Sequence, residues 1–93
     1  MRDKYYATND IKFAYSLMRA YYNQKDYQKS MFWTMKINEA EPDNEESWLF
    51  FAKNSAKLGK KDDAINALNQ YIEAFKSTKA KELLDEIQKG KFD

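Results

Sequence analysis

The amino-acid sequence repeats its pattern of apolar and small residues after 34 positions. The repeat is seen when Ile11 is laid over Glu45, so that residues 11–44 lie over residues 45–78. Periods of this length are typical of arrays in which each unit is a hairpin of two helices. The matching positions are Leu17 and Phe51, Met18 and Ala52, Tyr21 and Ser55, Lys25 and Gly59, Ser30 and Ala64, and Ile37 and Tyr71.

The apolar residues are spaced as in helices along the chain. Apolar residues between positions 11 and 24 fall three and four apart, as on one face of a helix, and no segment alternates with period two. Pro42, Gly59 and Gly90 are the only proline and glycine residues, and they mark segment ends. We therefore expect an all-α fold of five helices at about 11–24, 26–40, 43–58, 61–75 and 77–90.

Local signals predict how three of these helices begin or end. Asp43 is expected to cap the third helix, with Glu46 three places on in a capping-box arrangement. Gly59 is expected to end that helix in the left-handed conformation. Ser77 or Thr78 is expected to cap the fifth.

The composition is that of one small folded domain. Apolar residues make up 43% and charged residues 33% of the 93 positions, a balance unlike that of disordered chains. The net charge is +1, which provides no general field for a phosphate backbone, so nucleic acid is not an expected partner. The many Lys and Asn residues are typical of an AT-rich bacterial genome.

Several classes of function are disfavoured by missing residue types. The chain has no cysteine and no histidine, which removes thiolate metal sites, the commonest general base and the commonest transition-metal ligand. Residues 1–10 lack the apolar stretch of a signal peptide, and no run approaches a membrane span, so we expect a cytoplasmic location without membrane insertion.

Two segments resemble the tetratricopeptide repeat. YSLMRAYYNQKDY at residues 15–27, followed by Ser30 and Pro42, is similar to one copy, and WLFFA at 48–52 with Gly59 and Ala64 is similar to a second. The resemblance implies antiparallel helix-turn-helix hairpins stacked as a short right-handed superhelical array. It divides a single domain, residues 1–93, into a lead-in at 1–10, repeats at 11–44 and 45–78 and a capping helix at 79–90.

The resemblance also implies which residues are buried. Tyr21 and Tyr27 are expected to wedge between the helices of the first hairpin, while the small Ser30 and Ala64 allow close helix approach. In the capping helix, Leu83, Leu84 and Ile87 should face the core, and Lys81, Asp85 and Lys89 the solvent. The residues expected to pack in the core of the two repeats are Leu17, Tyr21, Phe51, Ala52, Leu68 and Tyr71.

In resembling proteins the first helix of each repeat lines a concave groove that holds a partner peptide. The corresponding side chains here combine rings with cations, which suits an extended or helical peptide carrying acids. Lysines on a helix face are also commonly just solvated, and Tyr22 is compatible with either the groove or the core. The implied groove residues are Lys12, Tyr15, Arg19, Tyr22 and Asn23 from the first repeat, and Glu46, Leu49, Phe50, Lys53 and Lys57 from the second.

The second helix supports an alternative function. Met31, Phe32, Trp33, Met35 and Ile37 spread apolar groups around most of its circumference, more than one hairpin can bury. We expect Phe32 or Trp33 to stay partly exposed, as a homodimer contact or as part of a larger solenoid. The other interpretation is that Trp33 only covers its own hairpin.

Catalysis is not expected, and nothing in the sequence requires a cofactor or a metal. The acids around Pro42 lie on a turn without a basic partner, and they lack the spacing and glycine turn of a calcium loop. Helix initiation and solvation account for them. The residues concerned are Glu39, Glu41, Asp43, Glu45 and Glu46.

Overall fold

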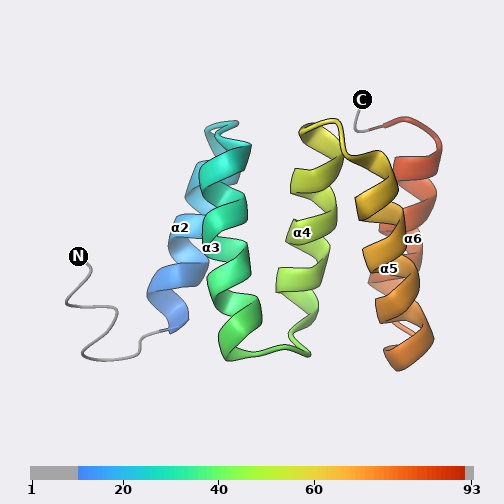
Figure 1. Cartoon of the computed structure of the whole chain (residues 1–93), viewed down its shortest axis with the longest axis horizontal. Coiled ribbons are helices and arrows are strands. Elements are labelled where there is room, and N and C mark those ends of the chain that lie inside the picture. The colour runs from blue at the N-terminus through green and yellow to red at the C-terminus, as the bar shows by residue number, and fades with distance from the viewer. Residues whose placement is uncertain (1–10, 92–93) are drawn as a thin grey trace.

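The computed structural model describes residues 11–91, which form five helices and no strand (Figure 1). The all-α fold is therefore confirmed. The expected lead-in, residues 1–10, lies outside the described residues. The helices are α2 Ile11–Asn23, α3 Tyr27–Ala40, α4 Glu45–Lys57, α5 Lys61–Phe75 and α6 Thr78–Gln88.

Successive helices run antiparallel and pack against their neighbours along the chain. Helix α4 lies in the middle of the molecule, between the pair α2–α3 and the pair α5–α6 (Figure 1). Helices α3 and α5 are on the side nearer the viewer, and α2 and α6 are on the far side. The resulting body is flat, with extents of 41 × 28 × 16 Å, so α4 contributes side chains to both broad faces.

Three helices end in the same hydrogen-bonded turn. At α4, Lys60 N–H donates to the Ser55 carbonyl at 2.7 Å and Gly59 N–H to the Ala56 carbonyl at 3.2 Å, the Schellman pattern. Gly59 has φ +83°, as expected from the sequence. Helix α6 ends in the same way at Gly90, and α2 at Lys25, where a lysine adopts φ +66°.

The expected cap of the third helix was wrong by one residue. Asn44, not Asp43, accepts from the Ser47 N–H at 2.9 Å, and the helix begins at Glu45. Glu46 does not close a capping box either, because its carboxylate binds Arg19 of α2. At α6 the cap is Ser77, one of the two expected residues.

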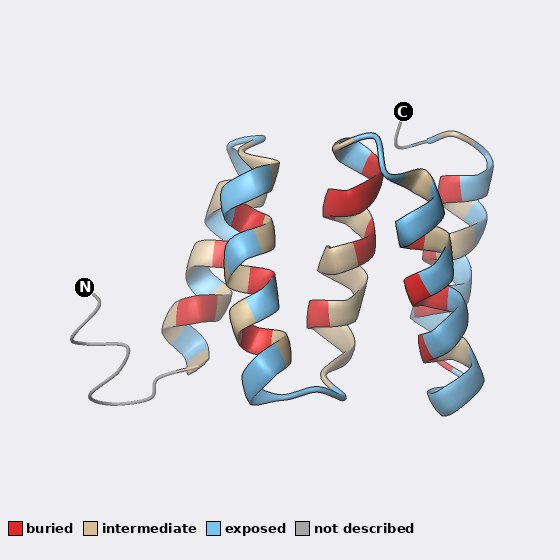
Figure 2. Cartoon of the chain, in the orientation of Figure 1, coloured by how far each residue is buried: buried red, intermediate tan, exposed pale blue. Residues whose placement is uncertain are grey.

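The buried residues form two clusters (Figure 2). The larger one joins α4, α5 and α6 and includes Ala52, Ala64, Leu68 and Tyr71. Leu83 and Ile87 of α6 are buried in it and Leu84 packs against it, as expected, whereas Lys81, Asp85 and Lys89 are exposed. The smaller cluster joins α2 and α3 and consists of Ala14, Met18 and Ile37.

Ser30 connects the two halves through buried hydrogen bonds. It is fully buried, its hydroxyl donates to the Met18 carbonyl at 2.9 Å, and it accepts from Asn54 Nδ2 at 3.0 Å. Asn54 is also fully buried, and its side-chain carbonyl oxygen has no hydrogen-bond partner among the described residues. This link ties α2 and α3 to α4.

Three of the residues expected in the core are only partly buried: Leu17, Tyr21 and Phe51. Leu17 and Tyr21 belong to neither buried cluster, and the Lys29 ammonium of α3 lies 5.5 Å from the centre of the Tyr21 ring. Phe51 lines an opening between α3 and α5. Within the first hairpin, Tyr22 rather than Tyr21 stacks on Tyr27, with ring centroids 5.4 Å apart.

No helix within residues 11–91 is both long enough and apolar enough to cross a lipid bilayer.

Replacing Lys25 with glycine should stabilise the fold by about 0.5–1 kcal/mol, because it removes the strain of a side chain at positive φ. The opposite kind of change at the equivalent position of α4, Gly59→Ala, should destabilise the fold by about 1 kcal/mol. An added Cβ at Gly59 meets no atom within 4 Å, so the loss comes from the backbone alone. Urea unfolding followed by circular dichroism measures both values.

The matched control is Gln24→Gly, one residue earlier and not at positive φ. It should destabilise slightly, through the entropy of the unfolded chain. A loss of stability in Lys25→Gly comparable to that of Gln24→Gly would contradict the strain at Lys25.

Candidate binding surface

Helices α2 and α4 are joined by a bidentate ion pair between Arg19 and Glu46. Arg19 Nε donates to Glu46 Oε2 and Arg19 Nη2 to Glu46 Oε1, both at 2.7 Å. The pKa of the Glu46 carboxyl is lowered because it accepts these hydrogen bonds, and the charges of Arg19, Lys53 and Lys79 act in the same direction. The pKa of Arg19 is raised by the same hydrogen bonds. This geometry fixes both side chains along the α2–α4 seam.

Two rings and an ammonium group lie beside this ion pair. Tyr22 of α2 and Phe50 of α4 stack edge-to-face, with centroids 5.2 Å apart. The Lys53 ammonium lies 4.9 Å from the centre of the Phe50 ring and 5.9 Å from that of Tyr22. Burial raises the pKa of the Tyr22 phenol. The side chains therefore form an aromatic surface with a cation at its edge.

Tyr15 extends this surface toward the loop between α3 and α4. Its hydroxyl donates to Glu41 Oε1 at 3.2 Å, and the Arg19 guanidinium lies 5.3 Å from the centre of its ring. Burial and the negative charge of Glu41 raise the pKa of the Tyr15 phenol to about 12. The phenol is therefore neutral at physiological pH. We call the surface formed by Tyr15, Arg19, Tyr22, Glu46, Phe50 and Lys53 the inner wall.

An open hollow of about 390 Å³ adjoins the inner wall between α4 and α6. Its two carboxylates are already engaged, since Glu46 binds Arg19 and Glu45 accepts from the Ser77 hydroxyl at 2.5 Å. Lys53 and Lys79 form no ion pair with any residue between 11 and 91. The hollow therefore presents two ammonium groups above an apolar floor. Its lining residues are Glu45, Glu46, Leu49, Phe50, Lys53 and Lys79.

The family model for anaphase-promoting complex, cyclosome, subunit 3 matches residues 1–71, which include all of α2, α3 and α4. The chain belongs to this family. It is a family of TPR-type repeats, so the tetratricopeptide resemblance is confirmed. Such repeats generally mediate contacts between proteins and are generally not catalytic. No curated protein and no solved structure matches the chain.

In this TPR-type chain the inner wall gathers most of the expected groove residues, but not all. Leu49 lies in the hollow and also packs against the α4–α6 core. Lys12 lies in the first turn of α2, Asn23 at its last residue and Lys57 in the last turn of α4, all three exposed. These three side chains flank the surface and are not among the wall contacts described above.

Lys79 lines the hollow but is not among the groove residues that the 34-residue repeat predicted. Residues 76–77 connect α5 to α6, whereas residues 41–44 connect α3 to α4, so a shift of 34 no longer aligns α6 with α4. Aligning the helices at their caps corrects this. Lys79 follows the cap Ser77 by two residues, as Glu46 follows the cap Asn44.

The two aromatic residues of the possible self-association surface on α3, Phe32 and Trp33, differ in their exposure. Phe32 is 53% exposed, in agreement with the expectation of a partly exposed ring. Trp33 instead packs against the α2–α3 core and contacts Phe13 edge-to-face at 6.4 Å. Phe32 stands against Trp33, with centroids 5.2 Å apart.

The acids near Pro42 are largely used within the structure. Glu41 accepts from Tyr15 and, at 2.9 Å, from Asn44 Nδ2, while Glu45 and Glu46 have the partners given above. Within residues 11–91, no three acidic side chains come together in a way that could hold a metal ion.

The Arg19–Glu46 pair should contribute about 0.5–1 kcal/mol to stability at neutral pH, since both side chains are partly exposed. A carboxyl whose folded pKa is lowered stabilises the fold above its unfolded pKa, near 4.5, and loses this as pH falls through the folded value. The stability difference between the natural chain and Glu46→Gln should therefore shrink from pH 6 toward pH 3. Urea unfolding across this range measures it.

The control is Asp85→Asn, which removes the more exposed Asp85–Lys89 pair at the C-terminal end of α6. Its effect at neutral pH should be about 0.3–0.5 kcal/mol at most. If Glu46→Gln costs no more than Asp85→Asn at neutral pH, the inner ion pair does not hold α2 to α4.

Proposed function

We propose that this domain binds a segment of another protein on its α2–α4–α6 side, and that the segment is an extended or helical peptide rich in acidic side chains. The supporting observation is the hollow between α4 and α6, where Lys53 and Lys79 have no ion-pair partner among residues 11–91, while Glu46 is paired with Arg19 and Glu45 accepts a hydrogen bond from Ser77. A carboxylate placed there would meet two cations and one acid, Glu45, whose charge no cation among residues 11–91 pairs with.

The inner wall supplies the apolar part of the proposed contact. Tyr22 and Phe50 present ring edges and faces beside the hollow, and aromatic surface of this kind contributes much of the affinity in protein interfaces. Arg19 has a different role from the one expected from the sequence. Because Glu46 neutralises it, Arg19 holds α2 to α4 and keeps the two rings together, and Lys53 and Lys79 act as the cations for the partner.

The test uses a labelled, end-blocked peptide, Ala-Glu-Leu-Glu-Ala-Leu-Glu-Ala, and the same peptide with Gln in place of every Glu. Fluorescence anisotropy should show tighter binding of the acidic peptide, weakened by salt. Lys53→Glu and Lys79→Glu should each weaken it about tenfold, which is 1.4 kcal/mol. Equal binding of the two peptides would contradict the proposal.

Lys81→Glu is the matched control, because it makes the same charge change on the same helix at an exposed position that does not line the hollow. It should keep the affinity within about twofold, since exposed charges at a distance are screened. If Lys81→Glu weakens binding as much as Lys79→Glu, only the net charge matters and the hollow is not the site.

A second candidate function is self-association through α3. It is favoured by one observation, the 53% exposure of the Phe32 ring next to Met35, which is 44% exposed. Sedimentation velocity should then show a concentration-dependent dimer that Phe32→Asp abolishes. Phe75→Asp is the control, because Phe75 is 48% exposed on another helix. A monomer at every concentration, or a dimer that survives Phe32→Asp, would exclude this contact.

A further inference from the structure

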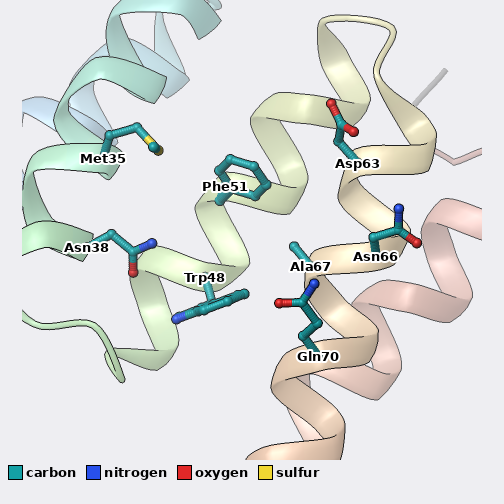
Figure 3. Close-up of a pocket in the computed structure, with 8 residues that line it drawn as sticks. All are labelled: Met35, Asn38, Trp48, Phe51, Asp63, Asn66, Ala67 and Gln70. Carbon is teal, nitrogen blue, oxygen red and sulfur yellow. The ribbon is translucent and has the colours of Figure 1, made fainter.

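A second hollow lies on the opposite side of α4, between α3 and α5. It has a volume of about 320 Å³, and Figure 3 shows the residues that line it. Residues from three helices line it, and none of them belongs to the inner wall. We call it the outer cleft. It is lined by Met35 and Asn38 of α3, Trp48 and Phe51 of α4, and Asp63, Asn66, Ala67 and Gln70 of α5.

The floor of the outer cleft is apolar and held in place. The Trp48 indole donates to the Pro42 carbonyl at 2.7 Å and stacks on Tyr71, with centroids 5.5 Å apart. Phe51 lies beside it, and the more flexible Met35 forms one wall. A rigid aromatic floor with an adaptable methionine wall suits one bulky apolar side chain.

The rim of the cleft carries amide groups. Asn38 accepts from the Ser47 hydroxyl at 3.1 Å through Oδ1, so its N–H groups remain for another acceptor. Asn66 and Gln70 follow one face of α5, are exposed, and form no side-chain hydrogen bond within residues 11–91. Each amide offers both a donor and an acceptor, which matches the pairing groups of a peptide backbone.

The one charged side chain among the described residues that line the cleft is Asp63. Asp63 lies at one end of it (Figure 3) and forms no ion pair with any described residue. Lys60 and Lys61 line a neighbouring hollow together with Asp62 and Asp63. Beyond Lys61, helix α5 carries three acids, Asp62, Asp63 and Glu73, and no further Lys or Arg. On α3, Lys36 lies over the Phe32 ring, 5.4 Å from its centre, and does not line the cleft. A ligand with a positive charge is therefore complementary to this side.

We propose that the outer cleft binds a peptide segment that carries one bulky apolar side chain next to a Lys or Arg. The apolar side chain fills the space above Trp48 and Phe51, the cation pairs with Asp63, and the amides of Asn66 and Gln70 bind the peptide backbone. This site is separate from the acidic-peptide site proposed for the inner wall, since the two lie on opposite sides of α4 and prefer opposite charges.

The probe is the end-blocked peptide Ala-Ala-Leu-Lys-Ala-Lys-Ala. In Trp33→Phe, Trp48 is the one remaining tryptophan of the two, so a saturable change of its emission reports the cleft directly. Replacing Leu by Ala, or both Lys by Glu, in the peptide should weaken binding at least about fivefold. If Trp33→Phe is poorly folded, the two indole N–H signals in the NMR spectrum of the natural chain give the same readout.

Asp63→Lys should weaken binding about fivefold or more, whereas Asp62→Lys, the same change at the neighbouring exposed residue outside the cleft, should stay within about twofold. Lys53→Glu should leave it unchanged, which separates this site from the inner wall. An unchanged Trp48 signal at millimolar peptide, or equal loss from Asp62→Lys and Asp63→Lys, would overturn the proposal.

Discussion

The buried contact of Ser30 with Asn54 positions α4, and both proposed surfaces depend on where α4 lies. A serine at this point lets α3 approach α2 and α4 closely, and its hydroxyl has a partner on each side. Because buried polar groups are costly without partners, the contact favours one relative position of the helices. That position places Phe50 against Tyr22 on one face of the molecule and leaves Trp48 and Phe51 on the other.

The net charge of the chain conceals two faces of opposite character. On the inner side, Arg19 neutralises Glu46 and Glu45 accepts a hydrogen bond from Ser77, so that the two ammonium groups of Lys53 and Lys79 outnumber the one acid left without a cation among the described residues. On the outer side, α5 carries acids and amides without a cation beyond Lys61. This separation arises from pairing rather than from composition, since unlike charges close together cancel each other's field.

Local signals in the sequence were sufficient for most of the helix boundaries. The expected range 61–75 is the observed α5, and the glycine at 59 ends α4 as expected, because these features depend on backbone conformation a few residues apart. The cap was misassigned to Asp43 because Asp and Asn at adjacent positions are almost equally good caps. The choice between them depends on how α3 enters the turn, which is a tertiary property.

Taken by itself, the sequence determined an all-helical chain, its period of 34 residues and the spacing that puts Tyr15, Tyr22, Phe50 and Lys53 on leading helices. Only the tertiary structure decided that Arg19 pairs with Glu46, that Lys79 reaches the same hollow as Lys53, and that Phe51 lines an opening instead of the core. The physical reason is the distance along the chain over which each feature is determined. Periodicity reports which residues share a face of one helix, whereas ion pairs and clefts depend on the distance between helices.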